Sequence, residues 1–283
     1  MTNLDNCGRN IWELVWQSFS TPIVSIDDFL SRMQVYNKNV DNLNGLKKYV
    51  ATLTDANDFI TVTIPTIAKI ALLLPELFGE ALPYLLAGQT NSLSITKYQA
   101  ACLIANAFVC SFPQRDANGV LDKLTLGNFN LTNLLSLDSD SGVLKIKCIV
   151  TYLKNIIDEV PDGIITITRY SNVGATESWI GDTTQIMANV GFESETPLQE
   201  TLNGLTIIDF ANCLVGGGFI GHGMLQEETL FACYPELLIA RLVVEKLDND
   251  EVVCVTGIQM YSHVHGYGHT ATFGGVNDDN TFS

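Results

Sequence analysis

The chain has 283 residues, of which 47% are hydrophobic and 16% are charged. This composition is typical of one large or two moderate globular domains with buried cores, and it excludes a disordered protein. The formal net charge of −16 excludes general electrostatic binding to nucleic acids, which depends on lysine and arginine.

Helical spacing of apolar residues dominates the first half of the chain. Residues 11–19 show the pattern of an amphipathic helix, and Ser25 precedes a second helix with an acidic first turn. A third apolar stripe, over residues 67–74, ends at a proline, and a fourth helix follows a capping residue that is either Ser94 or Thr96. The first half is therefore predicted to be helical.

Two apolar runs in this half invite comparison with membrane-spanning helices. Residues 64–88 are interrupted by Lys69, Pro75, Glu76, Glu80 and Pro83. Residues 98–112 are too short to cross about 30 Å of hydrocarbon. We expect both runs to be buried helices of a soluble core, without contact with a membrane.

Two changes of composition divide the chain. Residues 115–141 are rich in Asn, Asp, Gly and Ser, which predicts mostly loop. Near residues 160–163 the helical pattern gives way to β-branched segments. We therefore expect a helical domain over residues 1–160 and an α/β domain over residues 161–283.

The second half carries three segments with the composition of buried strands, at residues 163–169, 205–210 and 251–256. Between the last two lie a glycine-rich loop and a predicted helix that begins near Leu225 and continues past a break at Pro235. The order strand, loop, helix, strand is typical of a β–α–β unit in an α/β sheet.

The seven cysteines are scattered, and no two of them form a C-x-x-C pair. A zinc site or a disulfide framework is therefore not expected, and a reducing compartment is the simplest interpretation. The first residues lack the basic and apolar regions of a signal peptide. We expect an intracellular protein, in the cytoplasm, the nucleus or both.

The most informative segment is residues 208–228. A predicted strand ends at Asp209, three successive glycines follow at 216–218, and Gln226, Glu227 and Glu228 open the next helix. Glycines allow the main chain to approach a ligand closely, and a helix N-terminus tolerates anions. Taken singly these features are common, and the glycine spacing fits neither a dinucleotide fingerprint nor a phosphate-binding P-loop.

The combination is specific. A strand ending in Asp-Phe-Ala-Asn, then Gly-Gly-Gly, then seven residues and Gln-Glu-Glu resembles the signature of the poly(ADP-ribose) glycohydrolase family. The resemblance continues in order from about Trp12 to about Phe273. It implies an α/β fold in which a helical accessory domain precedes a macrodomain, a three-layer α/β/α mixed sheet. It also implies hydrolysis of the ribose–ribose O-glycosidic bonds of poly(ADP-ribose) on modified proteins.

The resemblance also implies roles for individual residues. Glu228 would be the catalytic acid and then the base, and Glu227 and Asp209 would support it. The implied substrate-binding residues are Asn212, Gly216, Gly217, Gly218, Gln226 and Tyr267. Contacts to adenine would come from the region of Leu198, Gln199 and Glu200, without a preference among the three.

Local geometry is consistent with one principal acid. Adjacent residues of a helix point about 100° apart, so Glu227 and Glu228 cannot act as opposed acid and nucleophile across one bond. Close carboxylates raise each other's pKa, whereas a helix N-terminus lowers it, and either effect could dominate.

The chain departs from the family pattern in places. Phe219 and His222 replace smaller loop residues. His222, His263, His265 and His269 do not show a fixed ligand spacing, so neither a metal nor another cofactor is expected. Family catalytic domains continue beyond the last residue here, which predicts a macrodomain incomplete at its C-terminal end. The alternative functions are a family member that binds ADP-ribose without turnover and an unrelated α/β nucleotide-binding protein; the oligomeric state stays open.

Overall fold

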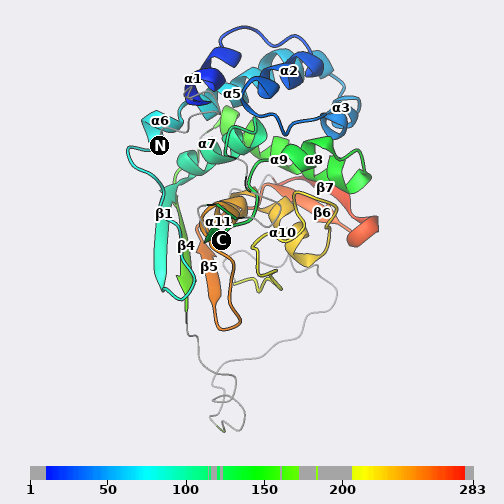
Figure 1. Cartoon of the computed structure of the whole chain (residues 1–283). Coiled ribbons are helices and arrows are strands. Elements are labelled where there is room, and N and C mark those ends of the chain that lie inside the picture. The colour runs from blue at the N-terminus through cyan, green and yellow to red at the C-terminus, as the bar shows by residue number, and fades with distance from the viewer. Residues whose placement is uncertain are drawn as a thin grey trace.

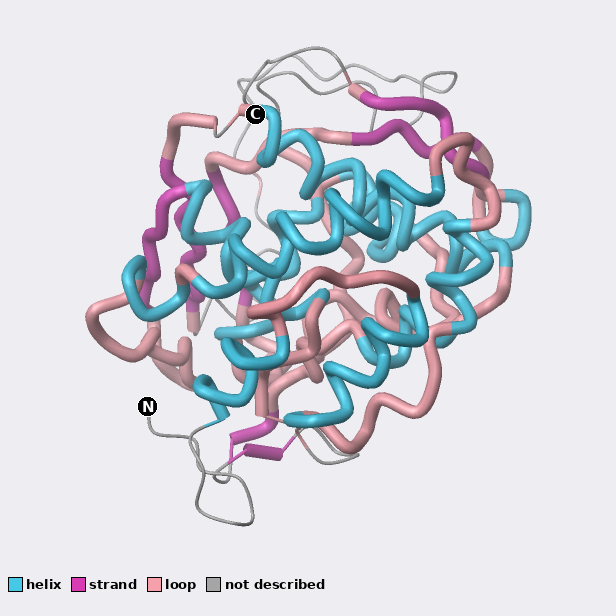
Figure 2. Tube along the Cα trace, turned by 90° about the horizontal axis from the view of Figure 1, so that it is seen from above, coloured by secondary structure: helices cyan, strands magenta, loops and turns pink. Residues whose placement is uncertain are grey.

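The computed structural model describes residues 11–113, 115, 120–121, 124–159, 161–171, 183 and 206–277. In Figure 1 helices form the upper part of the molecule and the labelled strands lie below and beside them, and in Figure 2 strands lie around the helices. The structural account below concerns these residues.

The first part of the chain is helical, as predicted from its apolar spacing. Its helices are α1 (Ile11–Ser18), α2 (Ile26–Tyr36), α3 (Asn44–Val50), α4 (Ala56–Asp58), the π-helical turn η1 (Phe59–Thr63), α5 (Ile64–Leu72), α6 (Leu74–Leu77), α7 (Lys97–Phe108), α8 (Thr132–Ser136) and α9 (Asp140–Asp158). The prediction of mostly loop over residues 115–141 was wrong at α8. Leu134 and Leu135 are fully buried there, so burial of two leucines outweighs the turn-forming residues around them.

Two helices begin at predicted capping residues. The Ser25 hydroxyl accepts a hydrogen bond from Asp28 N at 3.0 Å. Thr96 Oγ1 accepts from Gln99 N at 3.1 Å while Gln99 Oε1 accepts from Thr96 N at 2.9 Å, which makes a reciprocal capping box. The cap of α7 is therefore Thr96, and the alternative, Ser94, lies in a strand.

The core runs along α7, which packs against α5 and α9 and is buried from Ala100 to its end. The helical stretch Ala56–Leu77 is long and apolar enough to cross a membrane by length and composition, and a third of its most apolar window is buried, 33%. Core helices of soluble proteins meet the same criterion. The segment at residues 98–112 largely coincides with α7 in the core.

The largest sheet has three strands in the order β1 (Asn91–Thr96), β4 (Ile164–Tyr170) and β5 (Val252–Thr256). The strands predicted at residues 163–169 and 251–256 are confirmed. Both pairings are antiparallel, with Leu93 opposite Ile167 and Ile167 opposite Val255. Strand β1, which comes from the helical half, was not predicted.

The prediction of a β–α–β unit with a strand at residues 205–210 was wrong for the described residues of that segment. Residues 206–210 do not form a strand, and Leu205 lies outside the described residues. The main chain of this segment is instead bound by the Gln226 side chain, which accepts from Phe210 N and donates to Ile208 O, both at 2.9 Å. Since Ile208 and Phe210 are exposed, burial does not favour a strand there.

The second part continues with α10 (Gln226–Cys233), the 3₁₀ turn η4 (Pro235–Leu237) and α11 (Leu238–Val243), as predicted from the break at Pro235. A two-stranded antiparallel ribbon follows, formed by β6 (Ser262–His265) and β7 (Thr272–Val276) around the 3₁₀ turn η5 (Gly268–Thr270). The short ribbon β2 (Val120–Leu121) and β3 (Leu124–Thr125) completes the described strands.

Candidate active site

The glycine loop, residues 212–225, connects the irregular segment 206–211 to α10. It is wound by successive turns, with Gly217 N bound to Leu214 O at 3.0 Å and Phe219 N bound to Gly216 O at 2.9 Å. The Phe219 side chain is fully buried and anchors the loop to the core. Phe219, which replaces a smaller residue of the family pattern, thus fixes the loop to the core.

The glycines make room for two carboxylates. Gly216 and Gly217 have φ of +86° and +43°, a region that favours glycine. A Cβ atom on Gly217 would lie 2.5 Å from Glu227 Oε2 and 2.7 Å from Glu228 Oε1. Any larger residue would displace both side chains, so the loop and the two glutamates form one close-packed unit.

Glu227 and Glu228 stand in the first turn of α10 and are 6% and 7% exposed. Glu227 accepts from Asn212 N at 3.0 Å and from Gly216 N at 2.6 Å. Glu228 accepts from Gly218 N at 2.7 Å and from Leu225 N at 2.8 Å. Each carboxylate therefore bridges two main-chain N–H groups of the glycine loop, which fixes its orientation.

Burial raises the pKa of two carboxyl groups in this region, Glu227 and Asp209. It raises the pKa of Glu227 to about 7, with repulsion by Asp209 adding to the shift and hydrogen bonds from Asn212 N and Gly216 N opposing it. Burial, with repulsion by Glu228, also raises the pKa of Asp209 to about 6. At Glu227 desolvation contributes more to the pKa shift than either the neighbouring carboxylates or the main-chain hydrogen bonds.

Asp209 and Asn212 lie on the approach to the loop. Asp209 Oδ1 is buried and has no hydrogen-bond partner among the described residues. Asn212 Oδ1 accepts from Leu214 N at 3.0 Å, while the main-chain N–H of Asn212 binds Glu227. An orphaned buried carboxylate oxygen beside two more carboxylates has the chemistry to accept a ligand hydroxyl.

Tyr267 lies at the edge of the same loop. Its ring is 56% exposed, and the neighbouring Gly268 N donates to Met224 O at 3.0 Å, which ties the turn η5 to the glycine loop. The structure thus brings together the predicted site residues from Asp209 to Glu228, and it links the neighbour of Tyr267, Gly268, to Met224 of the glycine loop. Leu198, Gln199 and Glu200, the candidates for adenine contacts, lie outside the described residues.

Two buried basic side chains that donate to carbonyl groups of the glycine loop were not predicted. Lys145 Nζ, on α9, donates to Gly221 O at 2.5 Å and to Gly223 O at 2.8 Å, and Arg241 on α11 donates to Val215 O and Gly217 O. Burial lowers the pKa of Lys145 to about 8, and the negative charge of Glu228 opposes that shift. In sequence such residues are indistinguishable from solvated helix charges.

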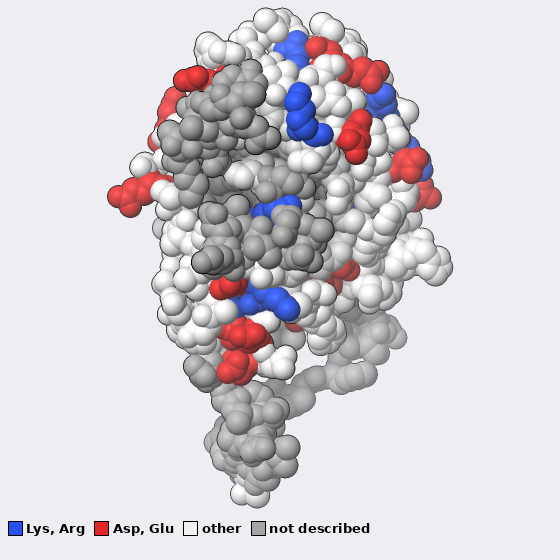
Figure 3. All heavy atoms as spheres, in the orientation of Figure 1, with Lys and Arg blue, Asp and Glu red and all other residues white. Residues whose placement is uncertain are grey.

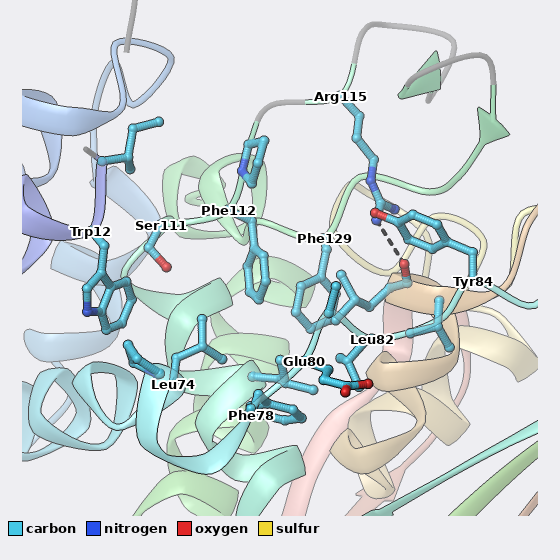
Figure 4. A pocket seen from close by; sticks show the side chains of 18 residues that line it. Trp12, Leu74, Phe78, Glu80, Leu82, Tyr84, Ser111, Phe112, Arg115 and Phe129 are labelled. Carbon is cyan, nitrogen blue, oxygen red and sulfur yellow. Dashed lines mark hydrogen bonds between the residues drawn. The ribbon is translucent and has the colours of Figure 1, made fainter. Parts of the chain in front are cut away.

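A separate cavity of about 490 Å³ lies in the helical part of the molecule. Its walls include Trp12, Phe78, Tyr84, Phe112 and Phe129, and Arg115 stands at its edge with a hydrogen bond to Leu242 O at 2.8 Å (Figure 4). None of the predicted site residues lines it, so it is not the candidate active site.

The charged side chains on one face of the molecule are scattered. On the face drawn in Figure 3 the described lysines and arginines do not form a continuous patch and lie among acidic side chains. In the described part of the chain no group of three or more His, Cys, Asp or Glu is arranged to hold a metal ion. His263 Nε2, for example, lies 3.2 Å from Asn277 Oδ1.

The sequence was compared with family models and with curated proteins. Residues 52–169 match the helical domain of poly(ADP-ribose) glycohydrolase, and residues 176–283 match its macro domain fold. Poly(ADP-ribose) glycohydrolase 1 of Caenorhabditis elegans is 30% identical over 206 residues, covering 72% of this chain and 24% of the relative. Poly(ADP-ribose) glycohydrolase 1 of Arabidopsis thaliana is 26% identical over 228 residues, covering 75% and 41%.

A third relative, poly(ADP-ribose) glycohydrolase 2 of Caenorhabditis elegans, is 24% identical over 272 residues, covering 94% of this chain and 53% of the relative. The chain thus spans about a quarter to a half of the length of these three relatives. The division of the chain near residues 160–163 stays a prediction. The two matched domains follow one another in the expected order, and with the clustered signature residues they lead to one conclusion: the chain belongs to the poly(ADP-ribose) glycohydrolase family, with a helical domain followed by a macro-fold domain.

Proposed function

We propose that this protein hydrolyses ribose–ribose O-glycosidic bonds of poly(ADP-ribose) on modified proteins and releases ADP-ribose. The observation that carries the proposal is the pair of buried carboxylates, Glu227 and Glu228, held against a glycine loop by four main-chain N–H groups. The family matches and the names of the relatives support the same substrate.

In this proposal Glu228 transfers the proton. Protonated Glu228 donates its proton to the leaving ribose oxygen as the glycosidic bond breaks, leaving an oxocarbenium-like centre on the other ribose. The Glu228 carboxylate then takes a proton from the attacking water, so the group ends the cycle protonated, as it began.

The neighbouring groups would bind the sugar. A carboxylate has about four lone-pair sites, and the main chain uses one on each oxygen of Glu227 and Glu228, so further sites are available to ribose hydroxyls. Asp209 Oδ1, which is buried and unpartnered in the described structure, supplies another acceptor. The diphosphate would be bound by main-chain groups of the glycine loop other than Gly216 N, Gly217 N and Gly218 N, which donate to Glu227, Leu214 O and Glu228. Main-chain groups are expected to do this because the chain has only 15 lysines and arginines against 31 acidic residues.

The test compares release of ADP-ribose from poly(ADP-ribosyl)ated protein by the unaltered chain and by Glu228→Gln. Loss of general acid–base catalysis should lower the rate by roughly 100- to 10,000-fold. Glu76→Gln, which changes an exposed glutamate of α6, is the matched control and should keep the rate.

Unchanged release by Glu228→Gln would remove Glu228 from the mechanism. If the folded, unaltered chain does not release ADP-ribose, the hydrolase proposal fails. Calorimetric titration with ADP-ribose would then test the alternative, a family member that binds the ligand without turnover.

A further inference from the structure

Arg241 is a buried arginine whose hydrogen bonds go to the main chain. It lies on α11 and is 6% exposed. Its Nε donates to Asn128 O at 2.6 Å, and its Nη1 donates to Val215 O at 3.1 Å and to Gly217 O at 3.0 Å. One guanidinium nitrogen therefore holds two carbonyl groups of the glycine loop.

These two carbonyls belong to the peptide groups that hold the glutamates. In a trans peptide the C=O of one residue and the N–H of the next point in opposite directions, and the described chain has no cis peptide bonds. The Val215 carbonyl shares its peptide group with Gly216 N, which donates to Glu227 Oε1 at 2.6 Å. The Gly217 carbonyl likewise shares its group with Gly218 N, which donates to Glu228 Oε1 at 2.7 Å. Two similar hydrogen-bonded paths thus lead from Arg241, each through one peptide group, to the carboxylates of Glu227 and Glu228.

Charge and shape both suit this arrangement. Burial lowers the pKa of Arg241 to about 10, and the negative charges of Glu227 and Glu228 oppose the shift, so the guanidinium stays protonated at neutral pH. A cation at the carbonyl end of a peptide group polarises its N–H toward an anion. The space for the side chain is bounded by Gly127, where a Cβ would lie 2.9 Å from Arg241 Cγ.

We infer that Arg241 is a positioning residue of the proposed active site, which orients both Glu227 and Glu228 through the peptide groups 215–216 and 217–218. The expected effect of Arg241 on the rate of ADP-ribose release rests on the proposed function. Arg241 acts from behind the loop, and its contribution is to keep two adjacent carboxylates in fixed and distinct orientations.

The first test is Arg241→Lys, which keeps the charge but lacks the planar fork of donors. Its kcat for ADP-ribose release should fall about 10- to 100-fold, as for other residues that orient catalytic ligands, with KM changing less than kcat. Hydrogen–deuterium exchange in the peptide spanning residues 214–226 should become faster. Arg169→Lys is the matched control, because Arg169 is also buried but donates to the carbonyls of Leu85, Glu245 and Lys246 and to the Glu251 carboxylate, and not to a carbonyl of the glycine loop.

A second variant guards against a failure of Arg241→Lys to fold. Gly127→Ala keeps the arginine at position 241, but the added methyl group would displace its side chain at Cγ. This variant should lower kcat and speed exchange of the same peptide, both to a smaller degree than Arg241→Lys does. Gly79→Ala, where nothing lies within 4 Å of the added Cβ, is its control.

The outcomes are distinguishable. Unchanged exchange of the 214–226 peptide, or unchanged kcat, in folded Arg241→Lys overturns the inference. Equal effects in Arg169→Lys also overturn it, because they would show a general loss of stability. If the unaltered chain releases no ADP-ribose, the proposed function fails, and the exchange comparison still decides whether Arg241 orders the two peptide groups.

Discussion

Glu227 shows how a single side chain combines opposing physical effects. It accepts two main-chain hydrogen bonds, which favour its charged form, and it is almost completely buried, which favours its neutral form. Burial prevails, because it raises the pKa to about 7. Near neutral pH the side chain is therefore poised between carboxyl and carboxylate, next to the proposed acid.

The raised pKa of Glu227 predicts that the stability of the fold depends on pH. Folding raises the pKa of Glu227 from its ordinary value of 4.5 to about 7, so the folded state binds the proton more tightly than the unfolded state. The stabilisation is complete below about pH 4.5 and is lost as the pH rises through about 7. Asp209, raised to about 6 from 3.8, acts with the same sign at slightly lower pH.

We expect the free energy of unfolding to fall by on the order of 1–3 kcal/mol between pH 5 and pH 8 from these groups. Urea denaturation at several pH values, for the unaltered chain and Glu227→Gln, measures it. The variant should show a flatter dependence. An equally steep fall in Glu227→Gln would show that the proton is taken up elsewhere.

At the scale of elements, the packing of α3 against the end of α8 depends on one glycine. A Cβ on Gly45 would lie 2.2 Å from Leu137 O and 3.0 Å from Leu135 O. Both are main-chain atoms that cannot move aside as a flexible side chain can. The close approach of these elements therefore requires glycine, although alanine would favour the helix itself.

Gly45→Ala accordingly sets helix propensity against a main-chain clash. Alanine would gain about 1 kcal/mol in helix propensity, yet overpacking of this kind typically costs about 1–3 kcal/mol, and the very short approach places Gly45 at the upper end. We expect a net loss of stability, seen as a lower urea midpoint. Gly79→Ala should change stability by less than about 0.5 kcal/mol. A midpoint for Gly45→Ala equal to that of the unaltered chain would contradict the tight packing.

Elements were predictable where local signals and burial agree. Ser25 and Thr96 cap helices, and Pro235 interrupts the helical region that begins at α10, because capping and proline effects act within a few residues. Residues 206–210 have strand composition, yet their main chain is bound by Gln226, which lies 16 residues beyond Phe210. Strand β1 forms because β4, far along the chain, offers a pairing edge. Such long-range partners leave no local signal.

At the scale of the whole molecule, a buried ion pair joins α7 of the helical domain to η4 of the macro-fold domain. Lys97 Nζ lies 3.6 Å from Glu236 Oε1, and both side chains are 0% exposed. Gln259 N and the Tyr261 hydroxyl also donate to Glu236, at 2.8 and 3.0 Å. Burial lowers the pKa of Lys97 and raises that of Glu236, while the attraction between the two opposes both shifts.

Glu236→Gln removes the carboxylate that balances the Lys97 ammonium in the core. Breaking a buried pair in this way costs about 3–5 kcal/mol, whereas removing both charges costs less, because no unbalanced charge is left behind. We therefore expect Glu236→Gln to lower the free energy of unfolding strongly and the double variant Lys97→Met/Glu236→Gln to recover part of the loss. Thermal and urea denaturation would measure both. The loss in the free energy of unfolding is also measured for Lys97→Met alone. If the loss in the double variant equals the sum of the losses in the two single variants, the pair is not coupled.

The sequence by itself determined the helical first half, two of the three strands of the main sheet and the break at Pro235. These follow from short-range periodicity and from residues that cap or interrupt a helix. The residues of the candidate site were predicted from a family resemblance, and their roles stay predictions. Only the tertiary structure decided that the sheet is antiparallel, that burial prevails over hydrogen bonding at Glu227, and that Arg241 and Lys145 stand behind the glycine loop. Desolvation and long-range hydrogen bonding depend on which distant residues meet in space, and that is set by the packing of the whole molecule.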